Sequence, residues 1–240
     1  MLADSVQHDW LAEPALMALS VLALASLGFL ALRTDSTAAA FAAVVNARYA
    51  CKEFDPSRPV ADATVDALLA LAQRAPTSFN TQPWVVVVVR DEAARARLVA
   101  SHAPGNQLKA LSAPINLVFA ADCEPEKLLN SASPAFVRDA LDMFMSQVSS
   151  PEAWAFKQTM TAAQTLMLAA SAHGLQTNPM EGFRSMQAVR DAVGLPPRYS
   201  VPVVISLGYE KARRREKPST RYPLDSVVHY DTFRAGSAER

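Results

Sequence analysis

Five consecutive valines follow a tryptophan at Trp84–Val89, and this run constrains the fold more than any other feature of the chain. Valine is branched at Cβ and favours extended backbone, so the run predicts a β-strand rather than a helix. No polar residue alternates with the apolar ones, which is typical of a strand that is buried on both faces. The chain must therefore supply covering layers on each side of a sheet that contains this strand.

Helices are predicted on either side of this strand from apolar periodicity and from capping residues. Ser150 and Pro151 together open the longest one, because serine caps a helix and proline fits its first position. Gly194 is a natural C-cap and ends a short one. The expected helices cover residues 36–46, 63–73, 92–101, 136–148, 151–173 and 186–193, and further strands cover 115–121 and 201–209. Few strands, several helices and no regular βαβ repeat indicate an α+β fold.

The composition excludes several kinds of site. Lysine plus arginine and aspartate plus glutamate number 23 each, so no bulk positive field is available to hold nucleic acid. The two cysteines, Cys51 and Cys123, have no Cys or His neighbours at metal-ligand spacing, which indicates a reducing compartment and no structural metal. Neither a G-x-G-x-x-G nor a G-x-x-x-x-G-K-[ST] motif occurs, so a bound nucleotide needs another kind of site.

An uncharged apolar segment at residues 14–32 precedes the first expected helix. Its length of about 19 residues is close to the ~20 that cross a bilayer as a helix. Because Arg33 follows it, the positive-inside tendency predicts a membrane anchor with the remaining chain in the cytoplasm. A helix buried in a dimer interface and a mis-set start, with Met17 as a later start, are the alternatives. We therefore divide the chain into a segment over 1–35, a domain over 36–230 and a tail over 231–240.

Three polar clusters are candidates for a binding site. The first is the basic loop 48–55 (R-Y-A-C-K-E-F-D), whose two cations can bind a phosphate and a second anionic centre, although the loop alone is better explained as a solvated face. The second is the turn 75–84 (A-P-T-S-F-N-T-Q-P-W), which suits a planar polar ligand but also fits ordinary turn chemistry. The third combines segment 178–183 (N-P-M-E-G-F) with segment 217–223 (K-P-S-T-R-Y-P), although Pro and Gly there can also simply mark turns.

Together the three clusters resemble the nitroreductase family, and the oxygen-insensitive bacterial type most closely. The likeness covers roughly residues 45–223 and has the motifs in the family's order and spacing. It implies an α+β fold with a central mixed sheet flanked by helices, in an intertwined homodimer. It also implies two FMN sites at the subunit interface and NAD(P)H as the reductant.

The resemblance also assigns roles to residues. Arg48 is expected at the FMN phosphate or pyrimidine edge, Lys52 near flavin N1 and O2, and Arg221 at the phosphate. The backbone N–H groups of Glu181 and Gly182 are expected to face flavin N5 and O4, and the turn 76–80 to serve the partner subunit's flavin. The full set of expected cofactor contacts is Arg48, Tyr49, Ala50, Lys52, Pro76, Thr77, Ser78, Asn80, Gln107, Pro179, Glu181, Gly182, Ser219 and Arg221. Ala50 and Ser219 depart from the serine and lysine that relatives often have there.

The expected chemistry is a ping-pong hydride transfer from NAD(P)H to a nitroaromatic or quinone acceptor, with Lys52 and Glu181 as the catalytic residues. A cation near N1 and O2 favours the reduced flavin, which carries negative charge there. Phe144 is the expected substrate contact, because segment 132–150 falls where relatives cover the flavin, although helical core packing accounts for its apolar residues equally well. A reductive dehalogenase and a flavin-binding protein of low turnover are the alternative functions.

Overall fold

The computed structural model describes residues 36–124, 129, 134–211 and 219–233. By its contacts the chain divides into two compact units, Met1–Asn46 and Ala47–Arg240. In the first unit the described residues, from 36 onward, are helical, as the sequence predicts. The apolar segment at 14–32 lies outside the described residues, so its predicted role stays a prediction. Within the described ranges, every helix is too short or too polar to cross a membrane.

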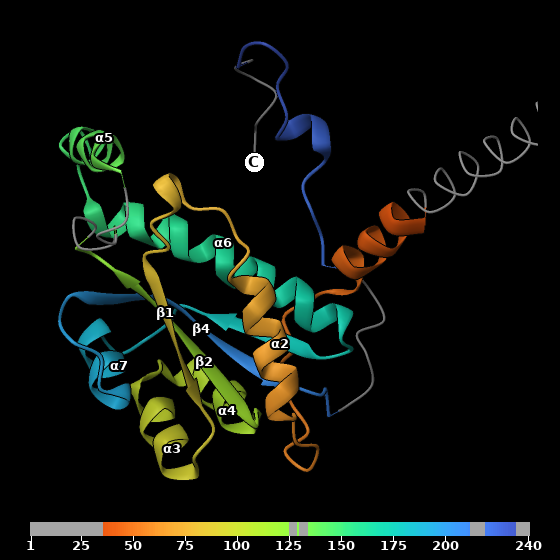
Figure 1. The fold of residues 1–240 in the computed structure, drawn as a ribbon. Helices are drawn as coiled ribbons and strands as arrows, with labels where there is room; N and C mark the ends of the chain where they lie inside the picture. Colours follow the sequence, from red (N-terminus) through yellow and green to blue (C-terminus); the bar gives the residue numbers. More distant parts are fainter. Residues whose placement is uncertain (1–35, 125–128, 130–133, 212–218, 234–240) are drawn as a thin grey trace, which may run out of the picture. The chain divides into compact units, whose positions relative to one another are not determined.

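The second unit combines a small sheet with helices on both faces (Figure 1). Its helices are α2 (Asp62–Ala72), α3 (Glu92–Ser101), α4 (Pro104–Ser112), α5 (Ala135–Met145), α6 (Pro151–Ala172) and α7 (Met186–Val193), with short 3-10 helices η1 (Ser78–Asn80) and η3 (Leu224–Ser226). Its strands are β1 (Trp84–Val89), β2 (Ile115–Asp122), β3 (Gln176–Met180) and β4 (Tyr199–Gly208). The predicted α+β class is confirmed.

The four strands lie in the order β1-β2-β4-β3, and each neighbouring pair is antiparallel. A parallel contact is added by the isolated bridge between Ala50 and Thr177 at the outer edge of β3. The register places Asn116 of β2 and Asn178 of β3 on either side of Ser206 of β4, so a row of polar side chains crosses three strands. Every residue of β2 and β4 is buried, as expected for the two central strands.

Two hydrophobic layers enclose this sheet. On one face α6 packs directly on the strands and α2 packs on α6, with Leu166 and Phe119 wholly buried in the contact. On the other face α3, α4 and α7 cover the strands around Val118 and Val204. Figure 1 shows this division of the helices between the two faces. The arrangement supplies the two covering layers that the valine run requires.

The edge strand β1 is less buried than its sequence predicts. Among the described residues β1 pairs only with β2, and 37% of the surface of Val85 is exposed to solvent. The valine run is apolar on both faces, but its outer edge has no neighbouring strand among the described residues. A position at the edge therefore explains the difference between the predicted and observed burial.

Most predicted helices are confirmed, and the capping residues act as expected. The hydroxyl of Ser150 accepts a hydrogen bond from the N–H of Ala153 at the start of α6. Gly194 ends α7 at φ 72°, a left-handed conformation that glycine adopts without strain. Two elements have no counterpart in the prediction. These are α4, which begins with Pro104 and Gly105, and the polar strand β3.

Candidate functional site

The basic loop lies along the outer edge of β3. The N–H of Cys51 donates to the carbonyl of Thr177 at 3.0 Å, next to the bridge formed by Ala50. Cys51 is fully buried against Phe54, and burial raises the pKa of its thiol, so it serves as an uncharged core residue. Lys52 follows the buried Cys51 and is exposed.

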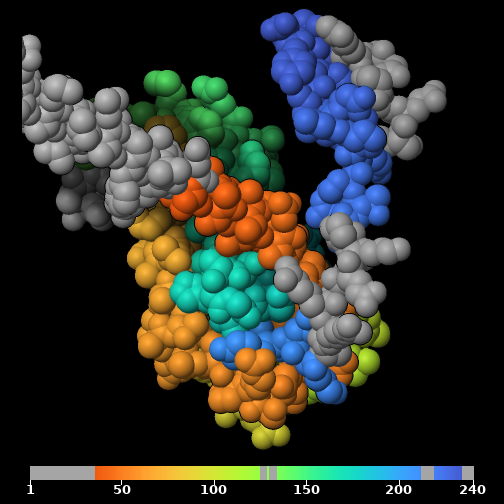
Figure 2. Space-filling model, turned by 90° about the vertical axis from the view of Figure 1, so that its right-hand side faces the viewer, coloured from red at the N-terminus to blue at the C-terminus, as the bar shows by residue number. Residues whose placement is uncertain are grey.

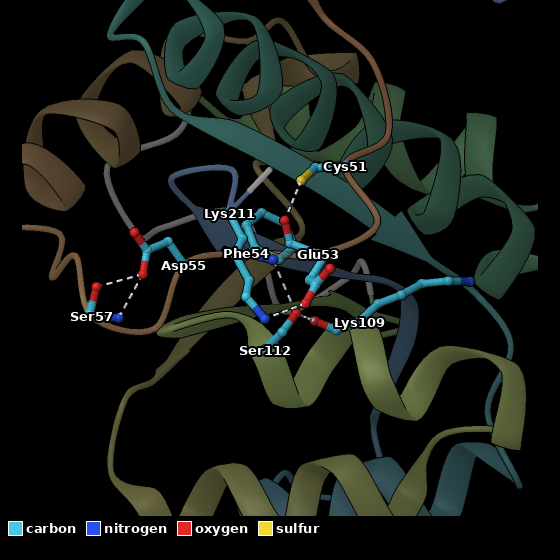
Figure 3. Close-up of polar contacts among 8 residues, drawn as sticks. All are labelled: Cys51, Glu53, Phe54, Asp55, Ser57, Lys109, Ser112 and Lys211. Carbon is cyan, nitrogen blue, oxygen red and sulfur yellow. Dashed lines mark hydrogen bonds and ion pairs between the residues drawn. The ribbon is translucent and has the colours of Figure 1, made fainter. Parts of the chain in front are cut away.

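The residues after Lys52 tie the loop to two other elements (Figure 3). The N–H of Phe54 donates to the hydroxyl of Ser112 at the end of α4, at 3.2 Å. The ammonium of Lys211, beyond β4, lies 2.6 Å from the carboxylate of Glu53. Both side chains of this ion pair are more than half exposed, so it is a weak tether rather than a major source of stability. The loop is thus held against α4 and β4 as well as β3.

A tight turn at Asp55 completes the loop. Its carboxylate accepts hydrogen bonds from the hydroxyl of Ser57 at 2.6 Å and from the Ser57 N–H at 3.0 Å. These bonds, the one from the hydroxyl above all, lower the pKa of Asp55. The guanidinium of Arg58 stacks 3.8 Å above the ring of Tyr209. Asp55 is therefore a structural carboxylate rather than a candidate acid or base.

The turn after β3 rests on the first turn of α4. The carbonyl of Gly182 accepts hydrogen bonds from the N–H of Ala103 at 3.0 Å and from Nδ2 of Asn106 at 3.2 Å. The other end of the same amide, Oδ1 of Asn106, accepts from the ammonium of Lys109 at 3.0 Å. In the described residues no hydrogen bond uses the backbone N–H of Glu181 or Gly182. Two neighbouring donors therefore remain available at this turn.

A buried histidine supports the same turn from behind. His102 is wholly buried, and its Nδ1 lies 2.8 Å from the carbonyl of Leu98, so Nδ1 carries the hydrogen. Burial lowers the pKa of His102, which keeps the ring neutral, and the ring meets Phe183 edge to face at a centroid distance of 5.4 Å. Gln107 donates to the carbonyl of His102 at 3.1 Å. Gln107 is thus engaged at the junction of α3 and α4, and it is Asn106 that contacts Gly182.

The predicted turn at 76–80 is anchored on α6 and has unusual backbone geometry. The N–H of Ser78 donates to Oε1 of Gln158 at 2.8 Å. Phe79, Asn80 and Gln82 have φ values of 55°, 53° and 46°, a region that favours glycine. Such strain costs of order 1–3 kcal/mol per residue and persists only where the surroundings impose it. The turn is therefore held in one specific shape.

Helix α5 contacts this turn through an aromatic pair. The ring of Phe144 lies 5.7 Å from the ring of Phe79, centroid to centroid, at an interplanar angle of 54°. Leu141 is the buried residue of α5, whereas Phe136 and Met143 are largely exposed. Figure 2 shows the surface of α5, in green, open to solvent. The structure thus places Phe144, the predicted substrate contact, beside the predicted cofactor turn.

The two halves of the predicted site lie at opposite edges of the sheet. The turn at 76–80 leads directly into β1, which forms one edge. The basic loop runs along β3, which forms the other edge. Three inter-strand spacings of about 4.8 Å separate these two edge strands. The turn and the basic loop of one chain thus belong to different edges of the sheet.

An open hollow of about 510 Å³ lies apart from both halves. It is bounded by the end of β1, the start of α3 and the end of α7, and Arg90, Arg97 and Asp191 contribute charged groups to its wall. None of the predicted site residues lines it. Among the described residues, the candidate site is therefore an edge of the sheet rather than this hollow.

The C-terminal members of the predicted set lie in the described segment 219–233. Arg221 is exposed, and its guanidinium donates to the backbone carbonyls of Ser219 at 3.3 Å and Thr220 at 2.9 Å. These bonds stay within its own segment. The structure of one chain thus does not bring Arg221 to Arg48 or Lys52.

Comparison with known proteins now decides the family. The model of the nitroreductase family matches residues 45–209. The chain belongs to the nitroreductase family. An NADH dehydrogenase of Thermus thermophilus is 32% identical over 181 residues, which are 71% of this chain and 86% of that protein. A Rhodopseudomonas palustris protein named as an NADH dehydrogenase/NAD(P)H nitroreductase is 36% identical over 159 residues, 66% of this chain and 79% of that protein.

A solved structure supports the same assignment of fold. It is the complex with FMN of an Exiguobacterium sibiricum protein assigned as a nitroreductase. Its TM-score to this chain is 0.70 at 23% sequence identity, and the match covers 79% of this chain and 96% of that one. The predicted family, α+β fold and oxidoreductase class of this nitroreductase-family chain are confirmed.

Sequence reasoning missed part of the site of this nitroreductase-family chain. The sequence predicts no helix over residues 104–112 and names Gln107 as the cofactor contact there. The structure shows Asn106 and Lys109, three residues apart, on the face of α4 that supports Gly182. Their i, i+3 spacing on one helical face was the signal that could have found them.

Proposed function

We propose that this chain is an NAD(P)H-dependent FMN oxidoreductase that reduces planar aromatic acceptors such as nitro compounds and quinones. The observation that carries the proposal is the presence, at and just after β3, of an exposed cation and free backbone donors. Lys52 follows Cys51, whose N–H is bonded to Thr177, and the N–H groups of Glu181 and Gly182, at the turn after β3, have no acceptor in the described part of the chain. A cation and N–H donors along one strand suit the anionic, acceptor-rich edge of a flavin.

Orphaned polar atoms in β3 support a ligand at this edge. Nδ2 of Asn178 and Oγ1 of Thr177 are almost wholly buried and have no hydrogen-bond partner among the described residues. A buried polar group without a partner costs ~1–3 kcal/mol, so such groups are usually satisfied by something outside the chain or by water. At the adjoining turn, a Cβ on Gly182 would lie 2.9 Å from Nδ2 of Asn106. Glycine at this position therefore leaves room for the Asn106 amide to reach the carbonyl of residue 182.

The residues of this chain would hold FMN from several sides. Arg48 and Arg221 would bind the phosphate or the pyrimidine edge, as guanidinium groups do with oxyanions. Lys52 would lie near N1 and O2, and the turn at Glu181 and Gly182 would present its N–H groups to N5 and O4. Tyr49, Ala50, Gln107, Pro179 and Ser219 complete the proposed set on the same chain.

Bound FMN would supply the chemistry, by taking a hydride from the nicotinamide and passing electrons to the acceptor in a ping-pong cycle. The chain's own contribution is electrostatic. The ammonium of Lys52 stabilises negative charge that develops beside it, which favours the reduced cofactor. The N–H groups of Glu181 and Gly182 fix the orientation of the ring, because the Asn106 and Ala103 bonds hold their turn in place.

The positions of the two half-sites support a homodimer as part of the proposal. The basic loop and the turn of one chain belong to opposite edges of the sheet, and we propose that the turn 76–80 of a second copy completes each site. Within that turn the N–H of Ser78 is already bonded to Gln158, and Oγ1 of Thr77 accepts from the N–H of Gln82 at 3.0 Å. The hydroxyl hydrogens of Thr77 and Ser78 and the exposed amide of Asn80 are therefore the groups proposed to reach the partner's cofactor, with Pro76 beside them.

We place the catalytic domain in the cytoplasm, where NAD(P)H is available and thiols stay reduced. Cys51 and Cys123 are both free, which agrees with a reducing compartment. Anchoring through residues 14–32 is a separate proposal, tested by carbonate extraction of membranes. Recovery of the full-length protein in the supernatant would reject the anchor.

The test of the proposed function starts from purified full-length protein. Denaturation should release FMN at about one per chain, and the oxidised holoprotein should absorb near ~450 nm. Under anaerobic conditions NADH or NADPH should bleach this band, and nitrofurazone or menadione should restore it. Release of FAD, or no flavin after reconstitution, would reject the proposal. Flavin that binds but is not bleached by either nicotinamide would support the alternative, a flavin-binding protein of low turnover.

A further inference from the structure

The contact between Phe79 and Phe144 has a feature that core packing does not explain. Phe79 has a φ of 55°, and yet 37% of the residue's surface is exposed. A bulky residue at positive φ is strained, and a half-exposed ring recovers little of that cost by burial. Strain that is not repaid by packing is typical of residues that serve a ligand. Phe79 thus differs from an ordinary core aromatic.

The turn and α6 hold Phe79 in this position. The N–H of Ser78 is bonded to Gln158, and the hydroxyl of Thr161, whose hydrogen is shared with the carbonyl of Gln158 at 2.6 Å, lies 3.1 Å from the carbonyl of Pro76. Both anchors come from α6, the long helix that packs on the sheet. The position of the Phe79 backbone is therefore set by the rigid part of the fold.

Phe144 approaches the same ring from α5. The two rings are 5.7 Å apart at 54°, and both remain more than a third exposed, with Phe144 at 39%. A tilted pair of this kind offers a corner in which a third flat ring can lie against one face and meet the other ring at its edge. Both arrangements are favourable for aromatic rings, whereas an aliphatic group gains only from the area it buries.

We propose that Phe79 is a specificity-determining residue, and that with Phe144 it forms an aromatic corner that selects flat aromatic electron acceptors over non-aromatic ones. The inference rests on the proposed function, because it requires that the turn at 76–80 borders the cofactor of the partner subunit. Both rings belong to the same chain, so one chain contributes the whole corner to the site of its partner. The chemical class selected is a planar ring of the size of a nitroaromatic or a quinone.

The experiment compares Phe79→Leu, Phe144→Leu and a matched control, Phe136→Leu, which makes the same change on the exposed surface of α5. Leucine keeps an unbranched Cβ, so the turn at residue 79 is not strained further. Two acceptors are used with each FMN-loaded variant. Nitrofurazone is flat and aromatic, and ferricyanide is a compact anion with no ring to stack.

Phe79→Leu and Phe144→Leu should each lower kcat/KM for nitrofurazone roughly 3- to 10-fold, mainly by raising KM, which is the loss expected for one aromatic contact. The value for ferricyanide and the FMN content should stay the same, and Phe136→Leu should change neither acceptor. The double variant should lose less than the product of the single losses, because each ring positions the other.

A binding measurement gives a readout that does not depend on turnover. Benzoate and cyclohexanecarboxylate have the same charge and similar size, and neither is reduced. Titration into the oxidised holoenzyme should show benzoate binding more tightly, and Phe79→Leu should remove most of that preference.

An unchanged ratio of nitrofurazone to ferricyanide in Phe79→Leu, together with an unchanged benzoate preference, would overturn the inference while leaving the proposed function intact. Wild-type protein that binds FMN but reduces neither acceptor would overturn the proposed function, and the inference with it.

Discussion

Removal of one hydroxyl, in Ser206→Ala, tests the buried polar row that joins the sheet to α4. Oγ of Ser206 donates to Oδ1 of Asn116 at 2.7 Å, and both residues are wholly buried. Nδ2 of Asn116 in turn donates to the carbonyl of Ala110 at 3.0 Å. In a helix this carbonyl would accept a hydrogen bond from the N–H of residue 114, but residue 114 is a proline and carries no N–H. Asn116 therefore supplies the bond that the end of α4 lacks.

The magnitude follows from the group that is left behind. Alanine at position 206 leaves Oδ1 of Asn116 buried without a donor, which costs about 1–3 kcal/mol of unfolding free energy. Asn116→Leu should cost more, because it orphans the carbonyl of Ala110 and the hydroxyl of Ser206 together. Once Asn116 is leucine, the additional change Ser206→Ala should be neutral or stabilising, since that hydroxyl no longer has its acceptor.

The assay is urea unfolding followed by circular dichroism, with protein and FMN concentrations held equal, because both ligand binding and association add stability by mass action. The matched control is Ser146→Ala, which removes an exposed hydroxyl that donates to the carbonyl of Met143 at 2.7 Å. The control should stay within about 0.5 kcal/mol of wild type. A Ser206→Ala loss no larger than that of the control, at an unchanged denaturant slope, would refute the assigned role of the polar row.

Three further changes test the site. Gln158→Ala removes the acceptor of the Ser78 N–H and should weaken FMN binding roughly 10-fold, as expected for loss of one hydrogen bond that anchors the turn. Gln158→Glu keeps an acceptor at this position, so its FMN affinity, measured by fluorescence titration, should stay near that of the wild type. Burial lowers the pKa of His102 from its ordinary 6.5, so the unfolded chain takes up a proton at a higher pH than the folded chain does, and the free energy of unfolding should fall as the pH drops through that value. In His102→Gln this fall below pH 6.5 should be absent from the stability profile, and an unchanged fall would contradict the assignment. Lys52→Met should lower the flavin reduction potential, measured by equilibration with a reference dye, because it removes a cation that favours the reduced flavin. Lys52→Arg keeps the charge and should retain much of the wild-type potential. A wild-type potential in Lys52→Met would contradict the proposed role of Lys52.

The elements that sequence predicts best are those set by local signals. The strand at Trp84–Val89 and the helices at Glu92–Ser101 and Met186–Val193 have the predicted bounds. Valine stiffness fixes the first, and side-chain caps fix the starts of the others, since Asp91 and Ser185 each accept an N–H from the first turn. These signals act over a few residues and need no knowledge of the fold.

The missed elements depend on distant partners. The strand β3 has the sequence Q-T-N-P-M, which is polar and contains a proline, so it has no strand pattern of its own. It is extended because it pairs with β4 and because the basic loop lies along its outer edge. Helix α4 opens with Pro104-Gly105, a dipeptide that marks a turn as readily as a helix start. Tertiary context decided both.

For the candidate site, the sequence names residues but not their arrangement. The order of the motifs points to the loop at 48–55, the turn at 76–80 and the turn at 181–182. That the first two lie at opposite edges of the sheet follows only from the strand order. Whether Asn106 or Gln107 contacts Gly182 depends on the rotation of α4 about its axis, which a single pair of adjacent amides does not reveal.

The exposed edge of β1 has a consequence for how this protein is produced. A six-residue segment with five valines, no charge and no proline has the composition of segments that form cross-β aggregates. Such a segment is hazardous while its edge is unpaired, and the flanking Pro83 and Arg90 are the residues placed to limit self-association. Newly made chains therefore face a competition between folding and misassembly along this edge. Slow synthesis at low temperature and refolding from dilute solution are the conditions that favour soluble protein.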